Sequence, residues 1–430
     1  MLLNKTKLPI KVEQLCLGLY VIVPLRWAHH PFLFNRFKIK TEKQIALIKS
    51  LGVEKLIVIP ERSDTSPLPL GEKPVQLDSE SAQEPAEDDE RLAKDKAAAF
   101  ALKQEQIERQ QAYMRGLQRT EQEFQRALGN VKAVMQDMQR RPVAALEEAS
   151  AVVAEVVDIL NDQSDLVLHL MNEPKADDGF YCHSLNVSVL SMLLAHAADL
   201  DETQMKYAGL GGLFHDLGKV RVAPEILKKV AALTDAEQQL LQQHPQYGLE
   251  IVKTLTDFPA DVLNIIAQHH EAIDGSGYPK GLKKEQITPL ARLVAVANEY
   301  DNLCHGRRDK PGLSPHAVLS YLFKNESHRL DKVMLQHFIR VLGVYPPGAV
   351  VQLSDGQFGL VMSVNSSKLL SPTILLYDPT VPRDQAAFVD LSEAELTITK
   401  VVKPSALSEA VFDYLKPRSH VSYFVESKGR

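Results

Sequence analysis

The chain has 430 residues, of which 45% are hydrophobic and 24% are charged, as in an ordinary globular protein. Its net charge of −6 argues against a protein that binds nucleic acid polymers, and no apolar run approaches the ~18 residues that span a membrane. The N-terminal residues lack the apolar segment of a signal peptide, and the three cysteines form no CxxC pair. We therefore expect a cytoplasmic protein of about three domains, without a disulfide framework.

Residues 1–62 predict a small module that mixes α and β structure. Two short β-rich runs, at 17–24 and 56–60, lie on either side of a helical pattern at 41–51 that Gly52 ends. A unit of this size is most simply a regulatory or docking module.

The segment 63–90 differs sharply in composition from its neighbours. It contains four prolines, and from residue 74 to residue 90 it carries seven acidic residues and no basic residue. Such a segment buries too little apolar surface to offset the entropy that it loses on ordering. We therefore expect an acidic disordered linker.

Residues 91–144 predict a long connecting helix, because helix-forming residues dominate this stretch. Its apolar residues recur with a heptad-like spacing at Tyr113, Leu117, Phe124, Leu128, Val131, Met135 and Met138. Two interpretations are open. Either the stripe forms a coiled coil, and thereby a homodimer through residues 91–141, or it packs on the neighbouring domain of the same chain.

Helical patterns continue through residues 145–345, and short β-rich runs separated by turn residues fill much of residues 346–430. The first stretch predicts a helical catalytic domain and the second a small antiparallel β unit. The predicted fold class is therefore mainly α, with a small α/β module before the helices and a β-rich unit after them.

Histidines and carboxylates gather in the helical stretch. A single inward-facing histidine is more often an ordinary core residue than a metal ligand. Here, however, several occur in separate helical segments, at His183, His215–Asp216, His244, His269–His270, Asn298 and Asp301. So many imidazoles are costly to bury without a partner that satisfies them, and a metal cluster is such a partner. Imidazole and carboxylate ligands without a thiolate favour iron or manganese over a cysteine-rich zinc site.

This series of residues, together with Lys219, Glu271, Asp274 and the Gly277–Tyr278–Pro279 run, resembles the HD-GYP family of bacterial metal-dependent phosphodiesterases. The flanking regions resemble one subgroup, which has an uncharacterised N-terminal domain. The resemblance implies hydrolysis of the second messenger cyclic di-GMP to the linear dinucleotide pGpG, and in some members on to GMP. It implies a signalling role, with other signalling proteins as further partners.

The resemblance also implies roles for individual residues. His183, His215, Asp216 and Asn298 would hold one divalent metal, and His244, His269 and His270 a second, with Asp216 between the two. The metals would be iron or, alternatively, manganese, and a hydroxide that bridges them would attack the phosphorus. Asp216 and Lys219 would be catalytic. Substrate would contact Gly277, Tyr278, Pro279, Arg307 and Lys310, and the supporting residues would be Glu271, Asp274 and Asp301.

Two positions depart from the family pattern. Asn298 stands where an aspartate ligand is common, and Gly179 stands where members with three metals have a glutamate, so we expect two metals. The amide at Asn298 is a weaker ligand than a carboxylate. One alternative is therefore a module that binds cyclic di-GMP or a partner protein with little or no turnover. Another is a hydrolase of the same kind that acts on a different cyclic dinucleotide or nucleotide.

Overall fold

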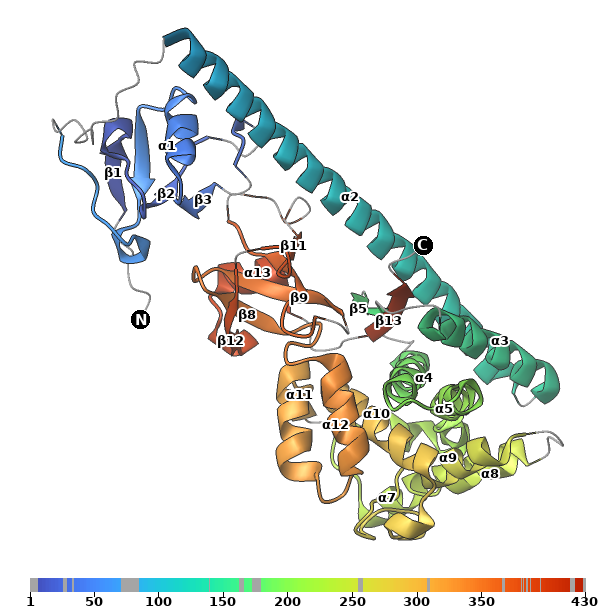
Figure 1. The fold of residues 1–430 in the computed structure, drawn as a ribbon. Helices are drawn as coiled ribbons and strands as arrows, with labels where there is room; N and C mark the ends of the chain where they lie inside the picture. The colour runs from blue at the N-terminus through green and yellow to red at the C-terminus, as the bar shows by residue number, and fades with distance from the viewer. Residues whose placement is uncertain are drawn as a thin grey trace. The chain divides into compact units, whose positions relative to one another are not determined.

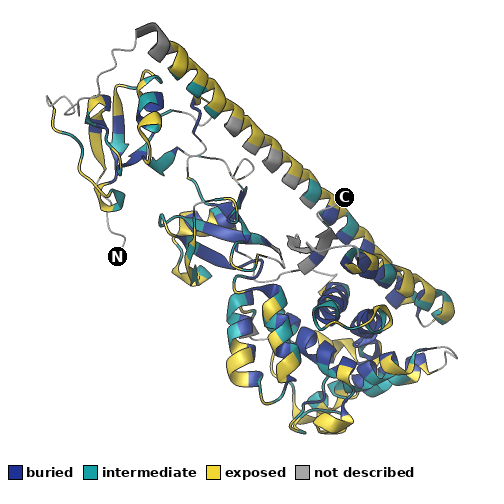
Figure 2. Cartoon of the chain, viewed as in Figure 1, coloured by how far each residue is buried: buried dark blue, intermediate teal, exposed yellow. Residues whose placement is uncertain are grey.

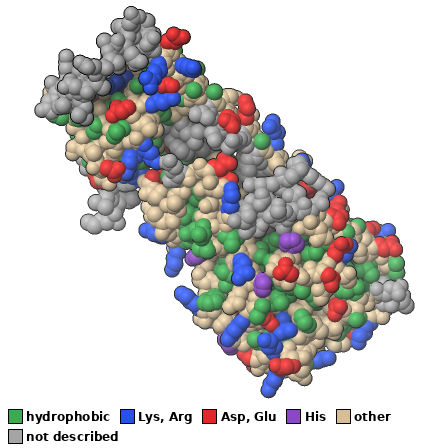
Figure 3. Space-filling view, viewed as in Figure 1, with side chains coloured by type: hydrophobic (Ala, Val, Ile, Leu, Met, Phe, Trp, Pro, Cys, Tyr) green, Lys and Arg blue, Asp and Glu red, His purple; other side chains and the backbone are tan. Residues whose placement is uncertain are grey.

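The structure is a computed structural model that describes residues 7–25, 29–32, 35–70, 85–138, 140–161, 166–171, 179–253, 258–307, 310–365, 368–379, 381, 383, 386, 388–394, 396–417 and 422–427. Contacts divide the chain into two compact units, Met1–Arg115 and Gly116–Arg430. Among the described residues, no helix has both the length and the apolar character needed to cross a bilayer. On the face in Figure 3, acidic and basic side chains are interspersed over the described surface.

The first unit contains a four-stranded antiparallel sheet in the order β1-β4-β2-β3, with one helix packed on it (Figure 1). The strands are β1 (Leu8–Lys11), β2 (Tyr20–Ile22), β3 (Arg36–Lys38) and β4 (Lys55–Val58), and the helices are η1 (Val12–Gln14), α1 (Glu42–Lys49) and η3 (Pro60–Arg62). Thr41 caps α1 by accepting from Gln44 N, and Ile45 and Ile48 of α1 join the core. The predicted α/β character is confirmed, and β1 and β3 are strands that the sequence analysis did not predict.

The expected linker, residues 63–90, is shorter in the structure at both ends. Asp64 N donates to Gly18 O at 2.9 Å and Leu68 N to Gln14 O at 3.0 Å, so the start of this segment is hydrogen-bonded to the chain between β1 and β2. The following helix, α2, already begins at Pro85, a residue favoured at the first position of a helix. Residues 71–84 lie outside the described residues.

The predicted connecting helix, 91–144, corresponds to α2 (Pro85–Asp137), and α3 (Pro142–Asn161) follows it at the start of the predicted helical domain. Phe124, Leu128, Val131 and Met135 of α2 are at most 5% exposed and belong to the core of the second unit. This part of the heptad-like stripe therefore packs on its own chain, as the second interpretation expected. The side chains of Tyr113 and Leu117 lie outside the described residues.

A layered set of helices forms most of the second unit, and its mainly α class is confirmed (Figures 1 and 2). The helices are α4 (Gly179–Ala197), α5 (Glu202–Phe214), η5 (Leu217–Arg221), α6 (Pro224–Leu227), α7 (Asp235–Leu241), α8 (His244–Val252), α9 (Ala260–Gln268), η6 (Lys284–Gln286), α10 (Pro289–His305), α11 (Pro315–Tyr321), the π-helix η7 (Leu322–Glu326) and α12 (Lys332–Leu342). Every residue of α4 from Ser184 to Ala195 is buried, so this helix is covered on all sides.

The β-rich unit after the helices is also confirmed, but one of its strands comes from within the helical stretch. The strands are β5 (Leu166–Met171), β8 (Val350–Leu353), β9 (Phe358–Asn365), β10 (Thr373–Leu376), β11 (Phe388–Asp390), β12 (Ile398–Val402) and β13 (Ser422–Ser427), accompanied by η9 (Pro404–Ala406) and α13 (Glu409–Leu415). β5 lies between β9 and β13 and is antiparallel to both. The sequence predicts a helix here, because the periodicity of a short apolar run does not separate a strand from a helix.

The last strand is also part of the helical core. Phe424 of β13 is 4% exposed and meets Phe124 of α2 edge-on, with ring centroids 6.0 Å apart. Phe124 and Phe424, from opposite ends of the second unit, therefore pack together in its core.

Replacing Phe424 with Ala is expected to destabilise the second unit by about 3–5 kcal/mol, because it removes a buried ring and leaves a cavity. The free energy of unfolding is measured by urea denaturation. Phe412→Ala is the matched control, since Phe412 is 42% exposed, and it is expected to cost less than about 1 kcal/mol. Equal losses in the two variants would contradict this role of β13.

Candidate metal centre

The histidines predicted as ligands lie at the ends of helices or near them. His183 is in the first turns of α4, His215 follows the last residue of α5, and His244 is the first residue of α8. His269 and His270 follow α9. The C-terminal end of a helix has main-chain carbonyls that lack partners within the helix, so a histidine that follows such an end can donate to one of them.

One cluster consists of His183, His215 and Asp216. The Nε2 atoms of the two rings are 3.1 Å apart, and they lie 3.5 and 3.4 Å from Asp216 Oδ2. Two nitrogens that each bind one ion at ~2.1 Å, at angles between octahedral and tetrahedral, are separated by about 3.0–3.4 Å. The distance between the two rings is therefore the distance expected of two ligands to one ion.

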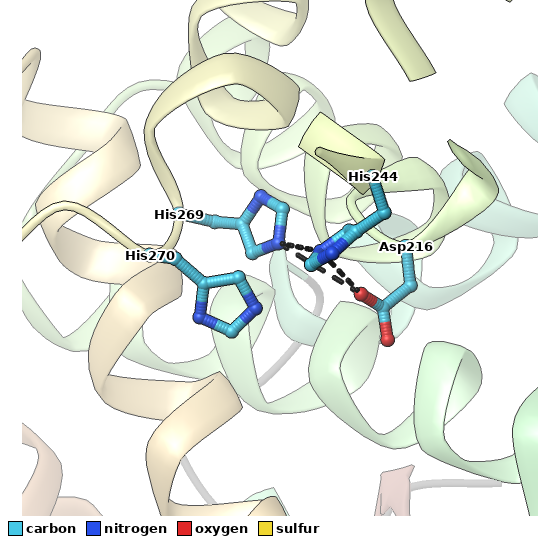
Figure 4. A group of neighbouring side chains, drawn as sticks. All are labelled: Asp216, His244, His269 and His270. Carbon is cyan, nitrogen blue, oxygen red and sulfur yellow. Dashed lines mark hydrogen bonds and ion pairs between the residues drawn. The ribbon is translucent and has the colours of Figure 1, made fainter. Parts of the chain in front are cut away.

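The second cluster uses the other oxygen of the same carboxylate (Figure 4). His244 Nε2 lies 3.2 Å from Asp216 Oδ1, His269 Nε2 lies 3.8 Å from it, and the two nitrogens are 3.1 Å apart. His270 completes this group, in which the ligand atoms all lie within 4.8 Å of one another. The structure thus brings together six of the seven predicted metal ligands, with Asp216 shared by the two clusters.

Main-chain carbonyls decide which ring nitrogen faces each cluster. Three rings place Nδ1 at 2.7–2.9 Å from the carbonyl of the residue three positions earlier, in the pairs His215–Gly212, His244–Leu241 and His269–Ile266. A carbonyl oxygen only accepts, so Nδ1 carries the proton and Nε2 keeps its lone pair. All three lone pairs are therefore directed to the clusters, as in metal-binding histidines.

The charges of the site favour cation binding. Burial lowers the pKa of His215, and lowers that of His269 and His270 well below the ordinary value, so these rings are neutral ligands near pH 7. Burial opposes ionisation of Asp216, but the positive charge of Lys219 is the main effect that outweighs burial, and the pKa of that carboxyl lies well below its usual range. Burial opposes protonation of His183, but its hydrogen bonds to Asp216 and Asp301 outweigh burial and raise the pKa of this ring. The site therefore combines three neutral imidazoles with an ionised carboxylate.

Asp216 provides the test of whether a metal fits. The residue is 1% exposed, and its Oδ1 is buried without a hydrogen-bond partner in the structure. A buried carboxylate oxygen without a donor is costly, and neutral imidazole lone pairs do not satisfy it. A divalent cation satisfies both the oxygen and the lone pairs, so the residues present fit such an ion.

Three further predicted residues lie near the first cluster: Lys219, which contacts Asp216, and Asn298 and Asp301, which belong to α10. Lys219 Nζ forms an ion pair with Asp216 Oδ2. On α10, Asp301 Oδ2 accepts from His183 Nδ1 at 2.6 Å, whereas the amide oxygen of Asn298 accepts from Asn302. Because Asn298 is joined to Asn302, its role as a ligand stays a prediction.

The loop that carries the Gly-Tyr-Pro run closes over His270. The ring of Tyr278 stacks on the His270 ring, with centroids 4.5 Å apart and planes 25° apart, and Tyr278 N donates to His270 O. A Cβ on Gly277 would lie 2.2 Å from Ala272 N, so only glycine fits there. Glu271 holds the loop by accepting from the main chain of Lys280 and Leu282.

Four other predicted residues, Asp274, Pro279, Arg307 and Lys310, lie in the outer part of this loop or in the hairpin after α10. Asp274 accepts from the main chain and hydroxyl of Ser276, at 2.9 and 2.6 Å, and so shapes the turn. Pro279 follows Tyr278 in the loop. Arg307 and Lys310 face each other in the two-stranded hairpin of β6 (Gly306–Arg307) and β7 (Lys310–Pro311), but their side chains lie outside the described residues.

Two polar residues at the centre were not predicted. Asn186 and His305 both contact Asp301, at 2.9 and 3.1 Å. Asn186 lies three residues after His183 on a helix that is otherwise mostly apolar, and a buried amide in such a helix is a signal that the sequence did contain.

Two family models match the chain. Residues 156–334 match the HD domain, and residues 7–149 match a domain of unknown function, DUF3391. The residues of the predicted motifs, from His183 to Lys310, all lie within the stretch that matches the HD domain. The HD model covers the helices that hold both clusters, from α4 to the start of α12.

Several curated proteins are similar to parts of this chain. A cyclic di-GMP phosphodiesterase of Pseudomonas aeruginosa is 33% identical over 252 residues, which are 59% of this chain and 61% of the relative. The response regulator RpfG of Xanthomonas campestris, also a cyclic di-GMP phosphodiesterase, is 32% identical over 165 residues, 38% of this chain and 44% of the relative. The 3'3'-cGAMP-specific phosphodiesterase 1 of Vibrio cholerae is 32% identical over 163 residues, 37% of each chain. The chain thus spans about three fifths of the first relative and less than half of the other two.

Gly218 allows η5 to lie close to α8, the helix that begins with His244. A Cβ at this position would lie 1.9 Å from His244 O and 2.5 Å from Gly248 N, so η5 and α8 approach each other only with glycine there. Gly218→Ala is expected to push His244 away from Asp216 and to weaken metal binding by about 10- to 100-fold.

Binding of Mn²⁺ by Gly218→Ala is measured by titration calorimetry. Gly129→Ala is the control, because nothing lies within 4 Å of a Cβ added at this position of α2. It is expected to leave metal binding unchanged and to raise helix stability by up to about 1 kcal/mol. Metal affinity that is equal in the two variants would show that the approach of η5 to α8 does not set the site.

Proposed function

We propose that this protein is a metal-dependent phosphodiesterase that hydrolyses cyclic di-GMP to pGpG at a dinuclear site. The observation that carries the proposal is the position of Asp216, whose two oxygens face two separate imidazole pairs. A carboxylate in this position holds two cations side by side, the arrangement used by many enzymes that cleave phosphate esters. Relatives that are cyclic di-GMP phosphodiesterases, among them those of Pseudomonas and Xanthomonas, support the choice of substrate.

Cations bound there would acidify a water molecule and offset the negative charge that grows on the phosphodiester. The chain's own residues orient this reaction. Lys219, paired with Asp216 and 25% exposed, has its ammonium at the edge of the site, where it stabilises charge on the phosphate or leaving oxygen. The loop with Tyr278 forms the wall beside His270 and excludes water from that side.

Iron is the metal we propose, with manganese as the alternative. The ligand set is imidazole and carboxylate, and none of the three cysteines is among its members. Cys182 and Cys304 are buried, and burial raises the pKa of the Cys304 thiol well above its usual value, so it is not a thiolate ligand. Metal analysis of protein prepared without oxygen tests the choice between iron and manganese.

The Vibrio relative favours a second candidate substrate, a mixed cyclic dinucleotide such as 3'3'-cGAMP. The metal ligands recognise a phosphodiester, which all cyclic dinucleotides share, so the bases must be distinguished elsewhere. Incubating the metal-loaded protein with several cyclic dinucleotides and separating the products by chromatography decides between the substrates. The same experiment shows whether pGpG accumulates or GMP follows.

A homodimer through residues 91–141 remains a separate proposal. The part of the stripe from Phe124 to Met135 is buried within the chain, so a dimer contact would use the earlier part of α2. Sedimentation of the full chain over a range of concentrations tests it.

His215→Ala is expected to lower turnover by more than about 100-fold, because loss of a residue that merely supports a ligand already costs about 10–100-fold. Release of pGpG is followed under reducing conditions with Fe²⁺ or Mn²⁺. His337→Ala, which changes a half-buried histidine of α12, is the control and is expected to keep full activity. Wild-type protein that binds cyclic di-GMP but releases no product would favour the binding module over the enzyme.

Arg307→Ala and Lys310→Ala are each expected to raise KM by about 10-fold or more, because each removes a charge-assisted bond to a substrate phosphate. Their metal content should equal that of the wild type. Arg340→Ala, at an exposed position of α12, is the matched loss of one positive charge and should leave KM unchanged. A fall in metal content with unchanged KM would assign the two residues to the metal site instead.

A further inference from the structure

The ligand histidines are oriented in two different ways. Those at His215, His244 and His269 donate to main-chain carbonyls, which their helices hold in place. His183 instead donates to a side chain, the carboxylate of Asp301. A carboxylate rotates about its side-chain bonds unless other groups hold it. The orientation of His183 therefore depends on what surrounds Asp301.

Two further side chains hold Asp301. Asn186, on the same helix as His183, donates from Nδ2 to Oδ1 at 2.9 Å. His305, the last residue of α10, places Nδ1 3.1 Å from Oδ2 and 2.9 Å from the main-chain oxygen of Asp301. Since that oxygen only accepts, Nδ1 of His305 carries a proton and donates to both atoms.

Because the Asp301 carboxylate is buried, the loss of one of its donors would change its orientation. Asp301 is 0% exposed, so water does not replace a lost donor, and the carboxylate would turn toward whichever donors remain. Such a rotation would move the acceptor away from His183 Nδ1. Nothing in these contacts involves the carbonyls that orient His244 and His269.

We infer that Asn186 and His305 are positioning residues for the metal held by His183, His215 and Asp216. By holding the Asp301 carboxylate, they direct His183 Nε2 toward Asp216. The metal position of His244, His269 and His270 is independent of them. The two halves of the centre are therefore unequal, because a side-chain network orients His183 in one half, whereas main-chain carbonyls orient His215, His244 and His269. This inference rests on the dinuclear centre of the proposed function.

His305 is the better residue to change, because its side chain is 21% exposed whereas Asn186 is fully buried. Replacing His305 with asparagine or glutamine separates the effect of its Nδ1 donor from the effect of its size. The amide nitrogen of His305→Asn takes the place of Nδ1, whereas that of His305→Gln reaches the place of Nε2 and leaves Asp301 without this donor. His196→Gln is the matched control, since His196 lies in the last turn of α4 as His305 does in α10.

The experiment titrates the metal-free full chain and its variants with Mn²⁺. Bound manganese is counted by mass spectrometry, and electron paramagnetic resonance separates an isolated Mn²⁺ from a coupled pair. Wild type, His305→Asn and His196→Gln are expected to bind two ions as a coupled pair. His305→Gln is expected to bind one ion normally and the other about 10-fold more weakly, so that an isolated Mn²⁺ signal accumulates at intermediate metal concentration.

A coupled pair in His305→Gln at wild-type affinity overturns the inference. Equal weakening of both ions also overturns it, because a general loss of structure would affect both positions, and thermal unfolding of each variant is recorded for that reason. Wild type that binds fewer than two ions would refute the dinuclear centre and the inference together. Because no substrate is present, failure of the proposed activity alone leaves this result unaffected.

Discussion

The buried carboxylate of Asp216 is the group on which the rest of the site depends. It lies between two pairs of imidazoles whose lone pairs face each other at 3.1 Å, and one of its oxygens has no hydrogen-bond partner. In the absence of a cation these groups are poorly satisfied in a buried environment. The fold must therefore hold them together by other means, and most of the second unit serves that purpose.

The helix ends provide the main constraint. A ring that follows the last turn of a helix reaches a carbonyl without a helical partner, and this bond both satisfies the carbonyl and directs Nε2 inward. The close approach of η5 to α8 at Gly218 then brings Asp216 and His244 together. Helix capping and glycine packing, which elsewhere only stabilise a fold, here determine where ligand atoms lie.

The β-rich unit and the helical core are connected more closely than their order in the chain implies. β5 precedes α4 in the chain, yet it pairs with β9 and with the last strand, β13. Phe424 of that strand enters the core that surrounds α4. The strands after the helices are therefore part of the body that holds the site.

The sequence by itself determined the ligand types, the HD and Gly-Tyr-Pro motifs and the mainly helical class, because local periodicity and residue spacing encode these features. It also showed the apolar stripe from Phe124 to Met135, but it did not show which surface this stripe packs against. Only the tertiary structure decided that this stripe packs within the chain, that 166–171 forms a strand, and that Asn186 and His305 meet at Asp301. The reason is physical: these features depend on contacts between segments far apart in the chain, whereas a local pattern reports only what lies within a few turns.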